Sequence, residues 1–181
     1  MIKKINAVLS LLLTGLLLIH AGYECIAYCL FYYNPMLSKV TGFVTASVFI
    51  MHVLISFISL FVLHDSGSVI YIRLNIKTVI QRICALIMAV LLPVHIYAFN
   101  LLQRYAGKVG YYLTEAAQIL FYAALFGHIA VSLTKSLITL GMIEKDAVRR
   151  RADTVISVIC LMLFAAAAVI TITTHTKLFL R

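Results

Sequence analysis

Five long apolar segments fill most of this chain, and short stretches with polar residues, proline or glycine separate them. Hydrophobic residues make up 64% of the 181 residues and charged residues only 12%, whereas soluble domains carry roughly 25% charged residues. A soluble fold of this length does not have enough interior to bury so much apolar surface. We therefore expect the lipid bilayer to be the solvent for most of the chain.

The polar breaks predict five membrane-spanning helices at about residues 5–33, 37–63, 78–102, 111–140 and 154–174. The breaks are Asn34–Pro35, the stretch 64–67 and Gly141, with polar loops elsewhere. Each segment is long enough for the ~20 helical residues that cross ~30 Å of hydrocarbon. The segments lack the alternating pattern of a transmembrane barrel. The predicted fold class is all-α, a single transmembrane domain over residues 1–181.

Basic residues are distributed unequally between the two sides of the predicted bundle. Ten of the fifteen lie on the side of the N-terminus: Lys3, Lys4, Arg73, Lys77, Arg82, Lys135, Lys145, Arg149, Arg150 and Arg151. The positive-inside rule then places the N-terminus in the cytoplasm and the C-terminus outside. This topology signal accounts for the net charge of +9, so we expect no nucleic-acid partner.

Four of the six histidines fall inside predicted spans, one in each of the first four helices: His20, His52, His95 and His128. The other two, His64 and His175, are predicted to lie at helix ends, where a polar side chain costs little. An ionisable residue inside the membrane is costly and usually functional. One such histidine is explained by an interhelical hydrogen bond, but four on consecutive helices indicate a shared function.

The depth of each histidine follows from its distance in sequence to the polar anchors on the N-terminal side. At 1.5 Å per residue, His20, His95, His52 and His128 lie about 24, 20, 18 and 10 Å from that surface. This order favours the pairing of His20 with His95 and of His52 with His128, although the heights of His95 and His52 are too close to rank these two residues.

Two histidines from different helices, twice and at two heights, are typical of bis-histidine ligation of b-type haem in a helix bundle. The sequence contains no Cys-x-x-Cys-His for covalent haem attachment, and zinc would require further cysteine or carboxylate ligands. The alternative is a small polytopic transporter, or another membrane protein whose histidines form interhelical hydrogen bonds or a proton relay. Such transporters usually carry acidic residues within their helices, and the second, third and fifth predicted spans have none.

Haem propionates need cations or hydroxyls where the bundle meets water. The candidates are Arg82, Lys77 and Lys135 on the N-terminal side and Arg104 on the other side. For any single one of these residues, an interface anchor whose charged end reaches water is the preferred explanation.

Several stretches together resemble the single-subunit, di-haem cytochrome b anchor of succinate:quinone and menaquinol:fumarate oxidoreductases. The most specific is "QRICALIMAVLLPVH", from Gln81 to His95, where the family has Gln-Arg-x-Thr-Gly, an apolar run and then histidine. A second is Gly127–His128, followed by a Leu-rich helix end, Gly141 and a basic turn. "KKINAVLSLLLTGLLLIH" and "SVFIMHVLISFISL" are similar to the family's first and second helices.

The resemblance implies five helices in a bacterial-type cytoplasmic membrane and two b haems, one held by His20 and His95 and the other by His52 and His128. It implies an electron-transfer subunit without catalytic residues of its own. Its partners would be an iron–sulfur subunit and a flavoprotein subunit on the cytoplasmic face, together with the lipid bilayer and menaquinone or another quinone.

Glu24, one helical turn from His20, is the candidate group for proton exchange with the quinone, because quinone reduction takes up protons with electrons. Tyr23 and Tyr28 are the candidate residues that would orient a quinone carbonyl. Glu115, at the start of the fourth predicted span, is the competing carboxylate.

Overall fold

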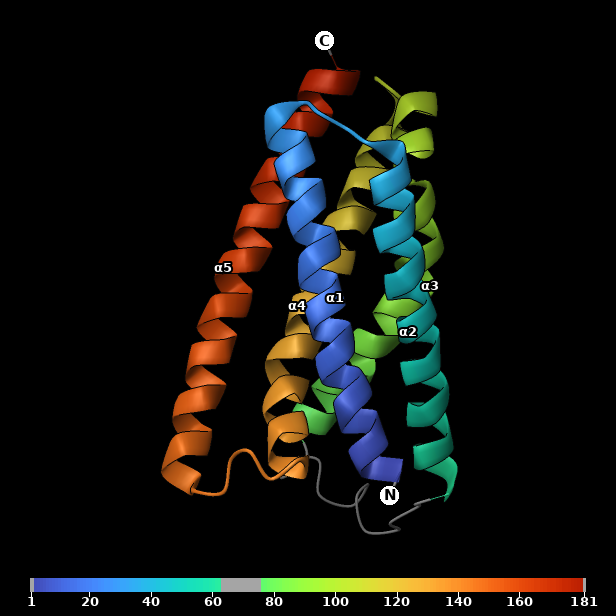
Figure 1. Ribbon diagram of the computed structural model, residues 1–181. Coiled ribbons are helices and arrows are strands. Elements are labelled where there is room, and N and C mark those ends of the chain that lie inside the picture. Colours follow the sequence, from blue (N-terminus) through green and yellow to red (C-terminus); the bar gives the residue numbers. More distant parts are fainter. Residues whose placement is uncertain (1, 63–75, 181) are drawn as a thin grey trace.

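The computed structural model describes residues 2–62 and 76–180, and within them the chain is an all-α bundle (Figure 1). The helices are α1 (Ile2–Leu30), α2 (Pro35–Val62), α3 (Ile76–Arg104), α4 (Val109–Thr139) and α5 (Asp146–Phe179). All five are long and apolar enough to cross a membrane, which confirms the predicted fold class and a multi-pass membrane protein. His64, the break at 64–67 and Arg73 lie outside the described residues.

The N-terminus and the C-terminus lie at opposite ends of the bundle, as an odd number of spans requires (Figure 1). We call these ends the N-terminal end and the C-terminal end. Consecutive helices run in opposite directions, so the bundle contains two antiparallel hairpins, α1–α2 and α3–α4, with α5 following.

Helix α4 is the centre of the bundle. About a third (33%) of the residues in its most apolar window are buried, against 6% in the corresponding windows of α2 and α3. It packs most extensively against α3, and also against α5 and α1. Within the described residues, α2 approaches only α1 to a Cα–Cα distance of 8 Å or less. The α3–α4 hairpin is therefore the packed part of the molecule, and α2 lies at its edge.

The turn between α1 and α2 is determined by Asn34 and Pro35. The side-chain oxygen of Asn34 accepts hydrogen bonds from the backbone N–H groups of Met36 and Leu37, at 3.0 and 3.2 Å. Asparagine is a favoured N-cap residue for this reason, and proline fits the first helical position because its missing N–H has no partner there. The predicted break at Asn34–Pro35 is confirmed.

Helix α1 ends at Leu30, three residues before the predicted end at residue 33. Phe31 has a left-handed backbone conformation, with φ 51°. The Tyr32 N–H then turns back to the Ala27 carbonyl, at 3.1 Å. Apolar character alone continues through these aromatic residues, so hydropathy did not mark the end of the helix.

Helix α4 ends at Thr139, close to the predicted stop at Gly141. Gly141 has φ +77°, and its N–H donates to the Ile138 carbonyl while the Met142 N–H donates to the Leu137 carbonyl. This pair of bonds is the Schellman motif, in which glycine occupies the left-handed position.

Helix α5 begins at Asp146, eight residues before the predicted start at residue 154. The prediction followed the apolar run, but the helix continues into the polar sequence that includes Arg149, Arg150 and Arg151. Asp146 lies in the first turn, where a negative charge favours the helix dipole. At 1.5 Å per residue, the added eight residues are about 12 Å of helix beyond the apolar run.

The α3–α4 interface contains a cluster of Met88, Phe121 and Ala124. Gly127 permits the close approach, because a Cβ atom there would lie 3.3 Å from the Cys84 Sγ atom. This approach positions His128, the next residue, against α3.

Candidate functional site

His20 lies on α1 with its Nδ1 atom 3.2 Å from the Thr41 Oγ1 atom of α2. The Thr41 hydroxyl donates its proton to the Leu37 carbonyl of its own helix, at 2.9 Å. Its oxygen is then free to accept a hydrogen bond from the His20 Nδ1–H.

The two histidines of the α3–α4 hairpin are held across the same interface in opposite directions. The His95 Nδ1–H of α3 donates to the Gln118 Oε1 atom of α4 at 2.9 Å, and the His95 ring stacks on Phe121 with centroids 4.5 Å apart. The His128 Nδ1–H of α4 donates to the backbone carbonyl of Gln81 on α3 at 3.0 Å. Gln118 is among the most deeply buried side chains.

These three hydrogen bonds have one consequence for the imidazole rings of His20, His95 and His128. A neutral imidazole with its proton on Nδ1 has a lone pair on Nε2. Within the described residues, none of the three Nε2 atoms makes a hydrogen bond. Metal-ligating histidines have this arrangement: one ring nitrogen donates to an oxygen acceptor, and the other is available to the metal.

His52 of α2 differs from the other three histidines. Its Nδ1 atom is buried and has no hydrogen-bond partner among the residues that the structure describes. A buried polar atom without a partner costs roughly 1–3 kcal/mol. Among the four histidine rings, that of His52 therefore has the least complete hydrogen bonding.

The structure brings the predicted pairs into common neighbourhoods. His20 and His95 lie within electrostatic range of each other, and so do His52 and His128. Within the described residues, the helices of each pair, α1 with α3 and α2 with α4, have no Cα atoms within 8 Å of each other. Each pair therefore spans the boundary between the two hairpins, where the backbones stay apart.

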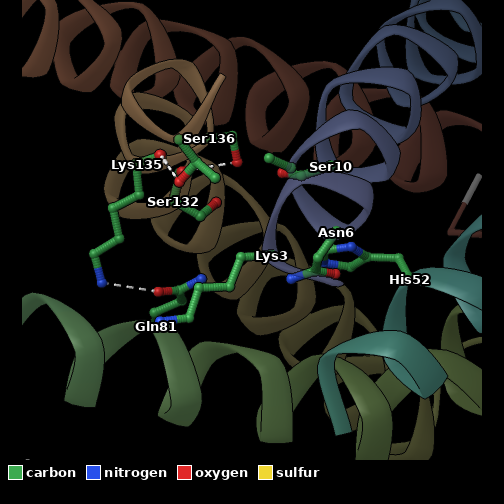
Figure 2. A pocket seen from close by; sticks show the side chains of 10 residues that line it. Lys3, Asn6, Ser10, His52, Gln81, Ser132, Lys135 and Ser136 are labelled. Carbon is green, nitrogen blue, oxygen red and sulfur yellow. Dashed lines mark hydrogen bonds between the residues drawn. The ribbon is translucent and has the colours of Figure 1, made fainter. Parts of the chain in front are cut away.

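A polar cavity of about 180 Å³ lies near the N-terminal end, between α1, α2, α3 and α4 (Figure 2). Its lining residues are Lys3, Asn6, Ala7, Ser10, His52, Gln81, Ser132, Lys135, Ser136 and Thr139. Two of these are cationic and none is acidic, so the cavity suits an anionic group.

Lys135 is the predicted propionate residue that reaches this cavity. Its Nζ atom donates to the Gln81 Oε1 atom at 3.1 Å (Figure 2). It also donates to the Thr78 Oγ1 atom at 2.9 Å. These contacts direct its ammonium group from α4 toward α3, whereas an interface anchor would reach out to water.

The other three predicted propionate residues lie elsewhere. Lys77 forms an ion pair with Asp153 of α5 at 2.6 Å. Arg82 is exposed. The Arg104 guanidinium lies 5.8 Å from the centroid of the Tyr105 ring at the C-terminal end.

The three predicted quinone residues have different partners. Glu24 accepts a hydrogen bond from the Ser38 hydroxyl at 2.5 Å. The Tyr23 hydroxyl bonds the backbone of Asn34, donating to its carbonyl at 3.0 Å and accepting from its N–H at 2.9 Å. Tyr23 and Glu24 thus stabilise the α1–α2 turn.

Tyr28 leads to a polar cluster that the sequence analysis missed. Its hydroxyl lies 3.1 Å from the His175 Nε2 atom, and the His175 Nδ1 atom lies 2.7 Å from the Glu115 Oε2 atom. His175 lies about one turn before the end of α5 at Phe179, but the prediction that a polar side chain costs little there was wrong, because His175 is only 2% exposed. The spacing of Thr171, Thr174 and His175, which share a buried face, was the signal available in the sequence.

Among the described residues, no three or more His, Cys, Asp and Glu side chains gather in a way that would hold a metal ion by themselves. Comparisons of the chain with models of protein families, with curated proteins and with solved structures gave no match.

Proposed function

We propose that this chain is a membrane-anchoring cytochrome b subunit that passes electrons between a soluble dehydrogenase and membrane quinone. It would hold two b-type haems, one with His20 and His95 and the other with His52 and His128. The observation that carries the proposal is the state of the imidazoles, since three of the four have Nδ1–H bound to an oxygen and Nε2 unengaged.

The donor set fits haem iron better than a bare metal ion. A haem supplies four nitrogen ligands of its own, so the protein has only to provide two axial imidazoles. Haem bound in this way supplies one-electron redox chemistry at a potential that its ligands and surroundings tune. The chain's own contribution is to orient the rings, exclude water and set the local charge.

The polar cavity is the candidate position for the propionate edge of one of the two proposed haems. Lys135 would hold a propionate carboxylate there, together with Lys3, which lines the same space. His52 lies on the wall of this cavity with its Nδ1 atom unpartnered. One region thus combines a candidate ligand with groups that neutralise a carboxylate.

The partners in this proposal are an iron–sulfur subunit and a flavoprotein of the succinate dehydrogenase or fumarate reductase type. Arg149, Arg150 and Arg151 are exposed in the first turns of α5, beyond its apolar run, and would meet an acidic face of the iron–sulfur subunit. This assignment places the N-terminal end in the cytoplasm. Charge reversal of the three arginines should release the soluble subunits at moderate salt. If the soluble subunits stay bound, the three arginines serve only to orient the chain in the membrane.

Haem content is the direct test of the proposal. Pyridine haemochrome analysis of the purified, folded chain should give two b-type haems per polypeptide. His175→Gln is a matched control, because it removes a buried histidine outside the proposed ligand set and should leave both haems in place. A folded wild-type sample without haem would refute the proposal.

The alternative is a haem-free membrane protein, a transporter for example, whose histidines serve as interhelical hydrogen-bond donors. The same three bonds favour it, since each joins two helices. The alternative predicts no visible absorption band, and it predicts that His128→Asn, which keeps an N–H donor, preserves stability and function. The haem proposal predicts that His128→Asn loses one cofactor.

A further inference from the structure

A chain of three polar side chains crosses the C-terminal end of the bundle. It runs from Tyr28 on α1 to His175 on α5 and on to Glu115 on α4, with contacts of 3.1 and 2.7 Å. The His175 and Glu115 side chains are 3% and 13% exposed. It therefore joins three helices through groups that all exchange protons.

The direction of the hydrogen bonds follows from the chemistry of each group. A carboxylate oxygen only accepts, so the Glu115 Oε2 atom takes the proton of the His175 Nδ1–H. The His175 Nε2 atom then has a lone pair and accepts the Tyr28 O–H. Every donor in the chain points toward Glu115.

The chain ends at the carboxylate of Glu115. Within the described residues, the second carboxylate oxygen of Glu115, Oε1, is buried and accepts no hydrogen bond. Glu115 is the last acceptor of the chain, so a proton that moves along the chain would end on its Oε2 atom.

The two ends of the chain, Tyr28 and Glu115, are half-buried, whereas His175 between them is fully buried. Besides His175, the titratable groups Glu24, Tyr33, Glu115 and Tyr122 lie within electrostatic range of Tyr28. Glu24 is also within electrostatic range of His20 and His95, so the Tyr28 end lies in the half of the bundle that holds this histidine pair.

We propose that Tyr28, His175 and Glu115 form a proton relay for a quinone bound against the Tyr28 hydroxyl. The inference rests on the proposed function. Oxidation of a quinol would release two electrons, one to each of the two proposed haems, and two protons, of which the relay takes one and water the other. A quinol hydroxyl gives its proton to the Tyr28 oxygen, the Tyr28 proton moves to the His175 Nε2 atom, and the Nδ1 proton moves to Glu115.

The reverse sequence resets the relay or serves quinone reduction. Glu115 returns its proton to the His175 Nδ1 atom, the Nε2 proton returns to the Tyr28 oxygen, and the Tyr28 proton leaves to water or to a reduced quinone oxygen. Each transfer breaks one bond to hydrogen and forms another, so no further reactant is needed.

The experiment compares two ways of reducing the purified holoprotein. A short-chain naphthoquinol must give up protons with its electrons, whereas dithionite supplies electrons alone. Tyr28→Phe and Glu115→Gln should slow reduction by the quinol on the order of 10²-fold, the usual effect of removing a proton-transfer group, and leave reduction by dithionite unchanged. Tyr112→Phe, at an exposed tyrosine of α4, is the matched control and should keep both rates.

Infrared difference spectra give a readout other than turnover. The wild-type protein should show a carboxyl C=O band that appears or disappears on reduction, and Glu115→Gln should abolish that band. Tyr28→Phe should slow its appearance while leaving its position close to that of the wild type.

The outcomes separate the two proposals. If the folded wild-type chain contains no haem, the proposed function fails. If haem is present and Tyr28→Phe reduces with the quinol within twofold of the wild-type rate, the relay is overturned and the function stands. Tyr28→Phe removes only a hydroxyl, so it decides the question even if Glu115→Gln fails to fold. Slowing by Glu24→Gln, with Glu115→Gln unaffected, would also overturn the relay.

Discussion

The two helix hairpins carry two histidines each, but they hold them differently. In α3–α4, His95 and His128 each donate to the opposite helix of the hairpin, across an interface that Met88 and Phe121 fill. In α1–α2, His20 has such a bond to Thr41, and the His52 Nδ1 atom has no partner. One hairpin thus fixes both of its rings, and the other fixes one.

This difference indicates which of the four histidine rings are already oriented before a cofactor binds. Ligands whose outer hydrogen bonds are in place keep their orientation before the metal arrives. Within the described residues, α2 approaches no helix but α1 closely, and helices in lipid lack a hydrophobic force that would press them together. We therefore expect a bound cofactor to supply the contact between α2 and α4 that the polypeptide alone does not make.

The largest expected effect distinguishes two arrangements: either the two histidines that bind one haem come from different hairpins, or they come from the same hairpin. His52→Ala and His128→Ala should lose the same haem, and His20→Ala and His95→Ala the other, because iron released by one axial ligand is not retained by the second. Each single variant should contain one haem, and the double variant His52→Ala with His95→Ala should contain none. Potentiometric titration of the remaining haem identifies which one is lost. Loss of the same haem by His20→Ala and His52→Ala would mean that each hairpin holds its own.

A smaller effect is expected from the residues that orient the rings. Gln118→Leu removes the acceptor of His95, and Thr41→Val removes that of His20, so both variants should weaken the same haem by roughly 10–100-fold. Transfer of haem to an excess of a soluble haem-binding protein measures the affinity. Ser47→Ala is the control, because the Ser47 hydroxyl bonds only the Phe43 carbonyl of its own helix. Unchanged transfer in both variants would show that these bonds do not prepare the ligands.

The smallest effect compares the packing of the two hairpins. A Cβ atom at Gly127 of α4 would lie 3.3 Å from the Cys84 Sγ atom, whereas one at Gly22 of α1 meets no atom within 4 Å. Both residues are inside helices, so Gly→Ala gives each the same propensity gain of roughly 1 kcal/mol. We expect Gly22→Ala to be the more stable variant by about 1 kcal/mol, since a Cβ atom at Gly127 requires the Cys84 side chain to move. Thermal unfolding in detergent measures the difference, and equal stability would show that the α3–α4 contact is no tighter than the surroundings of Gly22.

The sequence by itself determined the fold class and the number of spans. Hydrophobicity is a property of each segment alone, and a segment in lipid must satisfy its backbone internally, so length and composition are sufficient to predict a helix. The turn at Asn34–Pro35 and the stop at Gly141 were also local, because capping depends on residues a few positions apart. The ends at Leu30 and Asp146 were missed, since apolar character marks the part of a helix in lipid and not the whole helix.

Only the tertiary structure decided what the polar side chains contact. The sequence marked His20, His52, His95 and His128 by their cost in the membrane, but which acceptor each ring uses depends on the rotation and depth of a second helix. For the same reason, His175 was mistaken for a residue at a helix end, although Glu115 and Tyr28 lie 60 and 147 positions away from it. A hydrogen bond between distant residues forms only when helix packing brings two atoms within about 3 Å, and no local pattern encodes that distance.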